Sequence, residues 1–253
     1  MDLTTGTIVG TGGTYGTGWT FGSLTMSLVG NGWYKIMLVA TSDALGTASL
    51  QFSLHDGTTN VYTGDGVSGV YLWGAQIEAS NFATSYIPTT SAVTTRAADN
   101  LTYSIGSWYN QSEGTFDATY IQPTVATGIY PSIFAARLQS GNNSLNTLEA
   151  FASTSVTQAL VRIANVDQAT LMLGGGNSSA GASRNIAFAY KVNDFATAYD
   201  GTFGATDSSG SLINFDILNI GWAASNAYIN TYIKSISYYN TRLSNAKLQE
   251  LTL

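Results

Sequence analysis

Aromatic side chains that stand next to amides and carboxylates are the groups in this sequence whose spacing could do chemistry. Sugar recognition needs an aromatic face that stacks on the apolar side of a pyranose, together with short polar side chains that hydrogen-bond its hydroxyls. Most Trp and Tyr side chains of β-sandwich proteins pack in the core or across strands, so core packing is the alternative for each candidate. The candidate sugar contacts are Trp108, Tyr109, Asn110, Tyr199, Asp200, Trp222, Asn226 and Tyr228.

Catalytic arrangements are harder to find. A glycosidase needs two carboxylates that face each other across the scissile bond. The nearest pair is Glu113 and Asp117, for which a solvated strand face is the favoured interpretation. A Ser-His-Asp triad would need His55, the single histidine, and no Gly-x-Ser-x-Gly elbow accompanies it. We therefore expect no enzymatic activity.

Metal binding is restricted by the same composition. The chain has one histidine and no cysteine, which excludes histidine-based and thiolate zinc sites. Oxygen ligands for a structural calcium ion are available in or beside turns, although turn formation itself is the favoured role of these residues. The calcium candidates are Asp56, Asn60, Asp65 and Glu78, and no other cofactor is expected.

The charge pattern argues against nucleic acid as a partner. Charged residues make up 9% of the chain, the net charge is -6, and the nine Lys and Arg residues are scattered from Lys35 to Lys247. Nothing in this pattern could neutralise a run of phosphates. No apolar stretch is long enough to span a bilayer, so membrane insertion is not expected.

Apolar and polar residues alternate in several segments, which is the period of a strand with one buried face. The segments lie at 47–55, 116–120 and 186–192. Their apolar positions are Ala48, Leu50, Phe52 and Leu54, then Phe116, Ala118 and Tyr120, then Ile186, Phe188, Tyr190 and Val192.

Two further runs, 33–40 and 70–73, are apolar at successive positions, as expected for central strands covered on both sides. Only the C-terminal residues predict a helix, with Ser244 as its N-cap and Leu243 and Leu248 forming a hydrophobic staple. Residues 80–98 are typical of an extended connector. The pattern predicts an all-β chain of two β-sandwiches with one short C-terminal helix.

The first half resembles a module of phage and prophage structural proteins. The resemblance rests on Val-Tyr-Leu-Trp-Gly-Ala-Gln-Ile-Glu at 70–78, Thr-Ser-Tyr-Ile-Pro-Thr-Thr at 84–90 and Thr-Arg-Ala-Ala-Asp at 95–99. In that family the segment ends a jelly-roll, carbohydrate-binding-like module, and Gly-Asn-Gly-Trp-Tyr-Lys at 30–35 resembles one of its internal strands. The resemblance implies that residues 1–96 form such a module.

The second half, residues 97–253, resembles concanavalin A-like (laminin G-like) lectin modules. Glu-Gly-Thr-Phe at 113–116 is similar to an early strand of that family, and Ala-Phe-Ala-Tyr-Lys-Val-Asn-Asp at 187–194 to a central one. Ile-Ser-Tyr-Tyr-Asn-Thr-Arg-Leu-Ser at 236–244 resembles its final strand and helix.

Together the resemblances imply a non-enzymatic virion protein, made in the host cytoplasm, that binds host-surface glycans as a tail-fibre or baseplate adhesin. A capsid decoration or head-fibre protein is the first alternative, and a glycan-cleaving enzyme the second. Jelly-roll modules of this kind carry strands upstream of the segment corresponding to residues 2–7. We therefore expect the first sandwich to pair with other virion proteins or with further copies of the chain, a trimer being favoured.

Overall fold

A computed structural model of the chain gives the arrangement of its strands. The residues that it describes are 1–9, 18–42, 52–55, 59, 61, 63–79, 83–95, 99–122, 131–139, 145–153, 156–175, 181–223, 227–229 and 231–253. The chain divides into two compact units, which we call unit 1 (Met1–Thr95) and unit 2 (Arg96–Leu253). The predicted all-β fold with one short C-terminal helix is confirmed, whereas the family assignment of each unit stays a prediction.

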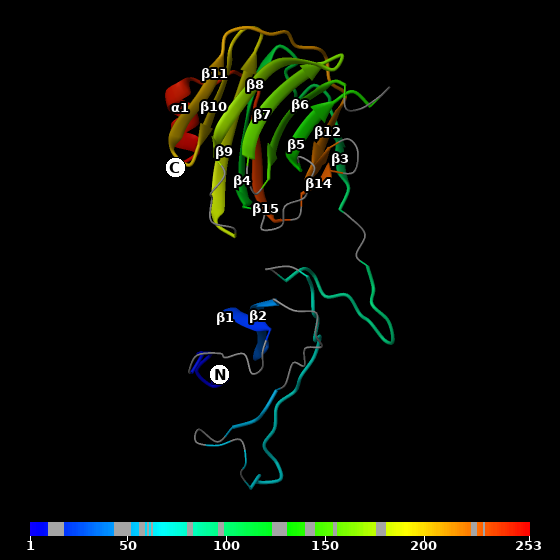
Figure 1. Ribbon diagram of the computed structural model, residues 1–253, viewed down its shortest axis with the longest axis vertical. Coiled ribbons are helices and arrows are strands. Elements are labelled where there is room, and N and C mark those ends of the chain that lie inside the picture. Colours follow the sequence, from blue (N-terminus) through cyan, green and yellow to red (C-terminus); the bar gives the residue numbers. More distant parts are fainter. Residues whose placement is uncertain are drawn as a thin grey trace. The chain divides into compact units, whose positions relative to one another are not determined.

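Unit 2 is built from two antiparallel sheets that lie face to face (Figure 1). One has five strands in the order β11-β10-β9-β4-β15, and the other has six in the order β3-β12-β5-β6-β7-β8. The strands of the first are β4 (Glu113–Ile121), β9 (Ser183–Lys191), β10 (Phe195–Tyr199), β11 (Thr202–Asp207) and β15 (Ile233–Tyr239). Those of the second are β3 (Leu101–Ser104), β5 (Ser132–Arg137), β6 (Thr147–Ala152), β7 (Val156–Ile163), β8 (Val166–Gly175) and β12 (Ile217–Ile220).

The core of unit 2 follows from the period-2 pattern of its strands. Phe116 on β4 is fully buried and stacks on Phe134 of β5 with ring centroids 4.5 Å apart, so side chains of the two sheets meet in one layer. Ile186 and Phe188 of β9 enter the same core. These strand predictions are confirmed for 116–120 and for 186–191. Val192 is 49% exposed because β9 ends one residue before it, at Lys191.

Helix α1 (Asn245–Leu251) covers the outer face of the five-stranded sheet. Ala187 and Ala189 of β9 point to that face, where Leu248 of the helix packs against them, so β9 is buried on both sides. The small alanine side chains let the helix approach the sheet closely. The side chain of Ser244 accepts a hydrogen bond from the backbone N–H of Lys247, which confirms the predicted N-cap.

Unit 1 contains one two-stranded sheet among its described residues, formed by β1 (Trp19–Gly30) and β2 (Trp33–Ser42). Asn31 and Gly32 connect the strands, and both have positive φ angles, 49° and 77°. That is the geometry of the type I′ turn, whose twist matches a hairpin. The strand predicted at 33–40 is therefore confirmed, but its predicted coverage is wrong, because Trp33 is 45% exposed and Leu38 46% exposed.

Two other strand predictions in unit 1 are corrected. Residues 70–73 have no strand assignment, and Tyr71 and Trp73 are 89% and 75% exposed. A run of apolar residues becomes a central strand only where neighbouring strands pair with it, and none does among the residues that the structure describes. Residues 52–55 likewise form no strand, while 47–51 lie outside the described residues.

Candidate functional site

The loop before β4 holds the first group of predicted sugar contacts, and the structure gives Tyr109 and Asn110 of this loop structural roles. Tyr109 is 5% exposed and stacks on Tyr238 with centroids 5.1 Å apart. The backbone carbonyl of Asn110 accepts a hydrogen bond from the Tyr190 hydroxyl at 2.7 Å, and its Nδ2 donates to the Asn240 carbonyl at 2.9 Å. Burial raises the pKa of Tyr109, so its hydroxyl stays protonated. The ring of Tyr109 is therefore not available to stack on a ligand.

The two other aromatic candidates in this region hold strand β3 in place. The indole Nε1 of Trp108 donates to the carbonyl of Ser104 at 3.3 Å, and that of Trp222 donates to the carbonyl of Leu101 at 3.2 Å. These carbonyls belong to the last and first residues of β3. Each tryptophan thus satisfies a backbone acceptor at one end of an edge strand, which is a structural role that sequence alone did not suggest.

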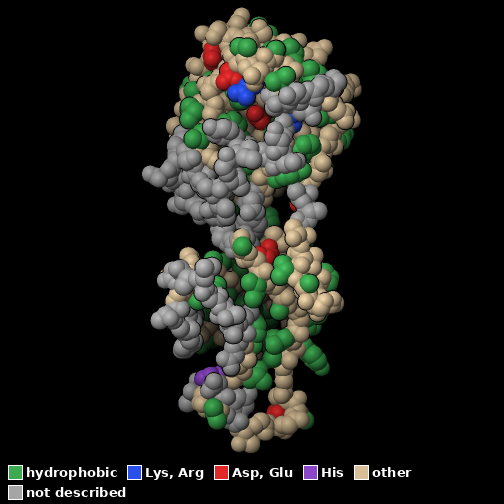
Figure 2. All heavy atoms as spheres, turned by 45° about the vertical axis from the view of Figure 1, so that its right-hand side comes forward, with side chains coloured by type: hydrophobic (Ala, Val, Ile, Leu, Met, Phe, Trp, Pro, Cys, Tyr) green, Lys and Arg blue, Asp and Glu red, His purple; other side chains and the backbone are tan. Residues whose placement is uncertain are grey.

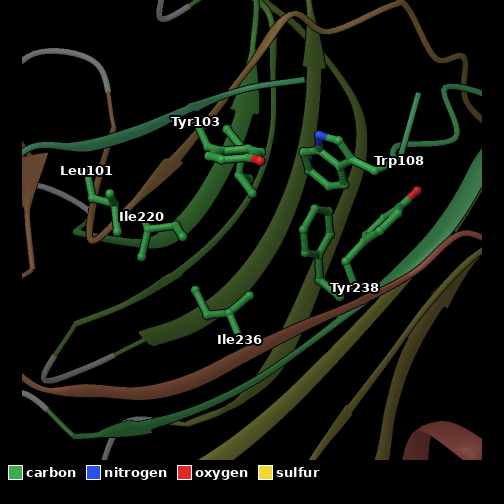
Figure 3. Close-up of a pocket in the computed structure, with 8 residues that line it drawn as sticks. Leu101, Tyr103, Trp108, Ile220, Ile236 and Tyr238 are labelled. Atoms are coloured by element: carbon green, nitrogen blue, oxygen red, sulfur yellow. The ribbon is translucent and has the colours of Figure 1, made fainter. Parts of the chain in front are cut away.

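Trp108 also lines an apolar groove between the two sheets (Figure 3). The groove has a volume of about 320 Å³ and opens where the edge strands β3 and β15 leave the sandwich uncovered. Its lining residues are Leu101, Tyr103, Trp108, Phe116, Leu218, Ile220, Ile236 and Tyr238. With so few polar groups in its wall, the groove alone lacks the hydrogen-bonding partners that a sugar requires.

The remaining predicted contacts lie in two further places. Asp200 has a φ of 44°, and its carboxylate accepts hydrogen bonds from Arg184 Nη1 at 2.7 Å and from the backbone N–H of Asn185 at 2.9 Å. Tyr199, beside it on β10, lies under the Arg184 guanidinium. Trp222 stacks on Tyr228 across the small hairpin of β13 (Trp222–Ala223) and β14 (Ala227–Tyr228), and Asn226 lies outside the described residues. The structure therefore does not bring the predicted contacts into one cluster.

A surface that the sequence analysis missed gathers polar side chains instead. Strand pairing aligns Leu218, Ala136, Leu148, Val161 and Ala169 across the six-stranded sheet, and all five enter the core. The rows on either side must point to the outer face, because side chains alternate along a strand. We call this outer face, with the two rows on it, the polar face. Its rows are Thr102, Asn219, Ala135, Glu149, Leu160 and Thr170, and Ser104, Ile217, Arg137, Thr147, Arg162 and Asp167.

Charges of opposite sign alternate on the polar face. Arg162 Nε lies 2.5 Å from the Asp167 carboxylate, and the Glu149 carboxylate accepts a hydrogen bond from Ser132 Oγ at 2.6 Å. Burial raises the pKa of Glu149, although the Ser132 hydrogen bond and the charge of Arg137 oppose the rise. Burial also lowers the pKa of Arg137, which is 1% exposed. Figure 2 shows acidic and basic side chains side by side on unit 2.

Two buried side chains of the polar face each have a hydrogen-bonding atom without a partner among the described residues. Asn219 is fully buried and its Oδ1 accepts from Thr102 Oγ1 at 3.2 Å, but its Nδ2 has no hydrogen-bond partner among the described residues. The hydroxyl of Thr147, a residue 3% exposed, is in the same state within that part of the chain. Leaving a buried donor unsatisfied costs about 1–3 kcal/mol. Neither atom has accessible surface that a ligand could touch, so the reachable groups of this face include Arg162 and Asp167, whose side chains are 33% and 46% exposed.

A signal for this face was present in the sequence. Glu149 stands between Leu148 and Ala150 in a strand, and Arg162 follows Val161 in the next one. In a chain with 9% charged residues, charges that alternate with core residues on adjacent strands indicate a shared face. The interpretation required the register of the strands, which the period alone does not give.

Three of the carboxylates considered for catalysis or for calcium accept hydrogen bonds from neighbouring residues. Glu113 accepts from the backbone N–H of Arg242 at 3.2 Å, and its carboxylate is 3.6 Å from Lys191 Nζ. Asp65 accepts from the backbone N–H groups of Val67 and Ser68 in a turn. Glu78 accepts from the side chain of Gln76 and the backbone of Thr84. Asp56 and Asn60 lie outside the described residues, and within these residues no group of three or more His, Cys, Asp and Glu side chains could hold a metal ion.

Comparison with known proteins gives no family for the chain. No family model matches it, and no curated protein matches it. No helix among the described residues is long and apolar enough to cross a membrane.

Comparison with solved structures gives distant likenesses to sialidases and to their binding modules. A carbohydrate-binding module, CBM40, of the Ruminococcus gnavus IT-sialidase bound to α2,3-sialyllactose is 13% identical, with a TM-score of 0.48 over 56% of this chain and 84% of that one. The Trypanosoma rangeli sialidase is 14% identical, with a TM-score of 0.45 over 56% of this chain and 22% of that one. The NanB sialidase of Streptococcus pneumoniae is 12% identical, with a TM-score of 0.48 over 60% of this chain and 26% of that one. This chain thus spans about a quarter of the two sialidases, and likenesses at these values transfer no function.

Proposed function

We propose that unit 2 is a non-catalytic carbohydrate-binding module whose ligand lies on the polar face. The observation that carries the proposal is the run of charges of alternating sign on this face, whose Arg162–Asp167 ion pair has side chains 33% and 46% exposed. Glu149 and Arg162 lie on adjacent strands of the face, in its two rows. Glycan hydroxyls donate to carboxylates and accept from guanidinium groups, so a polyhydroxylated ligand suits such a surface.

An Asp167→Asn variant tests the site, because asparagine keeps the shape of aspartate and removes the charge that pairs with Arg162. The variant should lose little stability, because an exposed ion pair contributes about 0–1 kcal/mol, while a glycan found on an array should bind about 3- to 10-fold more weakly. Glu250→Gln is the matched control, because Glu250 is the acidic partner of an exposed ion pair on α1. Affinities measured by titration calorimetry that are equal for wild type and Asp167→Asn would refute the location of the site.

The proposal that the protein binds glycans without cleaving them gives a separate expectation. Glu113, one of the two carboxylates considered for catalysis, is held by Arg242 and Lys191. Glycans that bind the array should be recovered intact after prolonged incubation with the protein. Shorter glycans detected by mass spectrometry would contradict this part of the proposal.

We further propose that the chain is a phage attachment protein, of a tail fibre or baseplate. The support is the junction at 70–78, 84–90 and 95–99, which resembles that of phage structural proteins. Electron microscopy of phage particles that carry the protein tests this location in the virion. Copies on the tail or baseplate would support attachment, and copies on the capsid lattice would replace it with decoration.

A further inference from the structure

Unit 1 has no buried residue among those that the structure describes. Every described position from 1 to 95 is exposed or partly exposed, whereas every residue of the buried core lies at or beyond Tyr109. The exposed residues include large apolar side chains in the segment 61–77. The exposed fractions are 82% for Val61, 89% for Val67, 89% for Tyr71, 75% for Trp73 and 81% for Ile77.

Such a surface does not suit a free monomer in water. Soluble monomers rarely expose contiguous apolar patches larger than a few hundred Å², and an isolated two-stranded sheet such as β1–β2 is marginally stable at best. Figure 2 shows hydrophobic side chains gathered on unit 1 with few charged ones among them. We therefore expect a partner to bury this apolar surface in the functional protein.

The chemistry of the segment suits a second copy of the same chain. Between residues 59 and 79 the charged residues are Asp65 and Glu78. The carboxylates of both accept hydrogen bonds from neighbours in their own unit. A nearly uncharged surface can meet its own copy about a symmetry axis without opposing like charges, and it offers no charge for a partner of opposite sign to recognise.

The β1–β2 sheet adds a second means of association. Each strand has one neighbouring strand in the described part of the chain, so each presents an open backbone edge over most of its length. Open edges of this length pair with strands of other chains unless they are covered. We propose that unit 1 is the self-association interface of the protein, in which the apolar segment 61–77 and the β1–β2 sheet pack against the same parts of further copies.

Sedimentation of the full chain tests the proposal. Wild type at micromolar concentration should sediment as a multiple of 26.6 kDa. The triple variant Tyr71→Ser, Trp73→Ser and Ile77→Ser should need about 100-fold more protein to associate. The matched control Val166→Ser, Met172→Ser and Val192→Ser removes exposed apolar side chains of unit 2, 60%, 51% and 49% exposed, and should associate like wild type.

Hydrogen exchange on the unmodified protein keeps the test independent of any folding defect in the variants. Amides of residues 63–79 should be better protected at high protein concentration than at low, while those of β9 should be unchanged. A wild type that stays monomeric at high concentration would overturn the proposal. So would a triple variant that associates as tightly as wild type, or protection of 63–79 that does not depend on concentration.

Discussion

The two units both contain continuous apolar runs but differ in what they bury. Ile133-Phe134-Ala135-Ala136 of β5 and Val70-Tyr71-Leu72-Trp73 of unit 1 are both continuous apolar runs, yet the first is fully buried and the second is 43–89% exposed. β5 pairs with β12 and β6 and faces a second sheet, whereas 70–73 has no paired strand in the described residues. The comparison shows that strand pairing and an opposing layer, and not local hydrophobicity, turn an apolar run into a core.

A pair of truncations should break the comparison most clearly. Phe116→Ala removes a fully buried ring that stacks on Phe134, and it should lower the free energy of unfolding of unit 2 by about 3–5 kcal/mol. Tyr71→Ala removes a ring that is 89% exposed and should change it by less than about 0.5 kcal/mol. Urea unfolding followed by circular dichroism measures both. Equal losses would mean that unit 1 contributes to the same cooperative core.

Glycine substitutions should give the next largest difference. A Cβ at Gly114 would lie 2.6 Å from the Tyr190 hydroxyl and 2.7 Å from that of Tyr238, so Gly114→Ala should cost about 1–3 kcal/mol through overpacking. At Gly64 a Cβ would meet nothing within 4 Å, so Gly64→Ala should be neutral or slightly stabilising. Thermal unfolding distinguishes them, and an undisturbed Gly114→Ala protein would show that the tyrosine pair can move aside.

The smallest expected effect is a shift in the pKa values of two aspartates in opposite directions. Burial raises the pKa of Asp117 on β4 above 3.8, whereas hydrogen bonds from Ser68 and Val67 lower the pKa of Asp65 to about 2. The contribution of Asp117 to stability is therefore fully present below pH 3.8 and lost as the pH rises through its folded pKa. That of Asp65 is present above pH 3.8 and lost as the pH falls towards 2.

Carboxyl-carbon NMR titration measures both values, and Asp117→Asn assigns the Asp117 resonance. The variant should also lose stability less than wild type when the pH is raised from 4 to 7. A pKa of Asp117 at or below 3.8 would contradict its burial on the five-stranded sheet.

Sequence patterns predicted the elements of unit 2 that depend on local chemistry. The alternation at Phe116, Ala118 and Tyr120 identified β4, and Ser244 identified the start of α1. Both signals depend only on residues that are close together in the sequence, so the alternation and the N-cap can be recognised without knowing the tertiary structure.

The site was harder to predict because it depends on pairing between distant strands. Trp108 and Trp222 were interpreted as sugar contacts from their composition, but their indole N–H groups donate to the carbonyls of Ser104 and Leu101. The polar face arises because Arg137 pairs with Thr147 and Thr147 pairs with Arg162. A period of two states that such residues share a face of their own strand, but the register decides which strands they meet.

The attachment of β3 has a mechanical consequence. Unit 2 begins with this strand, which among the described residues pairs with β12 through the four residues from Leu101 to Ser104. A pulling force transmitted through unit 1 would therefore load the edge of the six-stranded sheet first. β3 would detach and break its hydrogen bonds to the indoles of Trp108 and Trp222, while Phe116 and Phe134 stay packed, so the detached strand would lengthen the connection between the units before the core is disrupted.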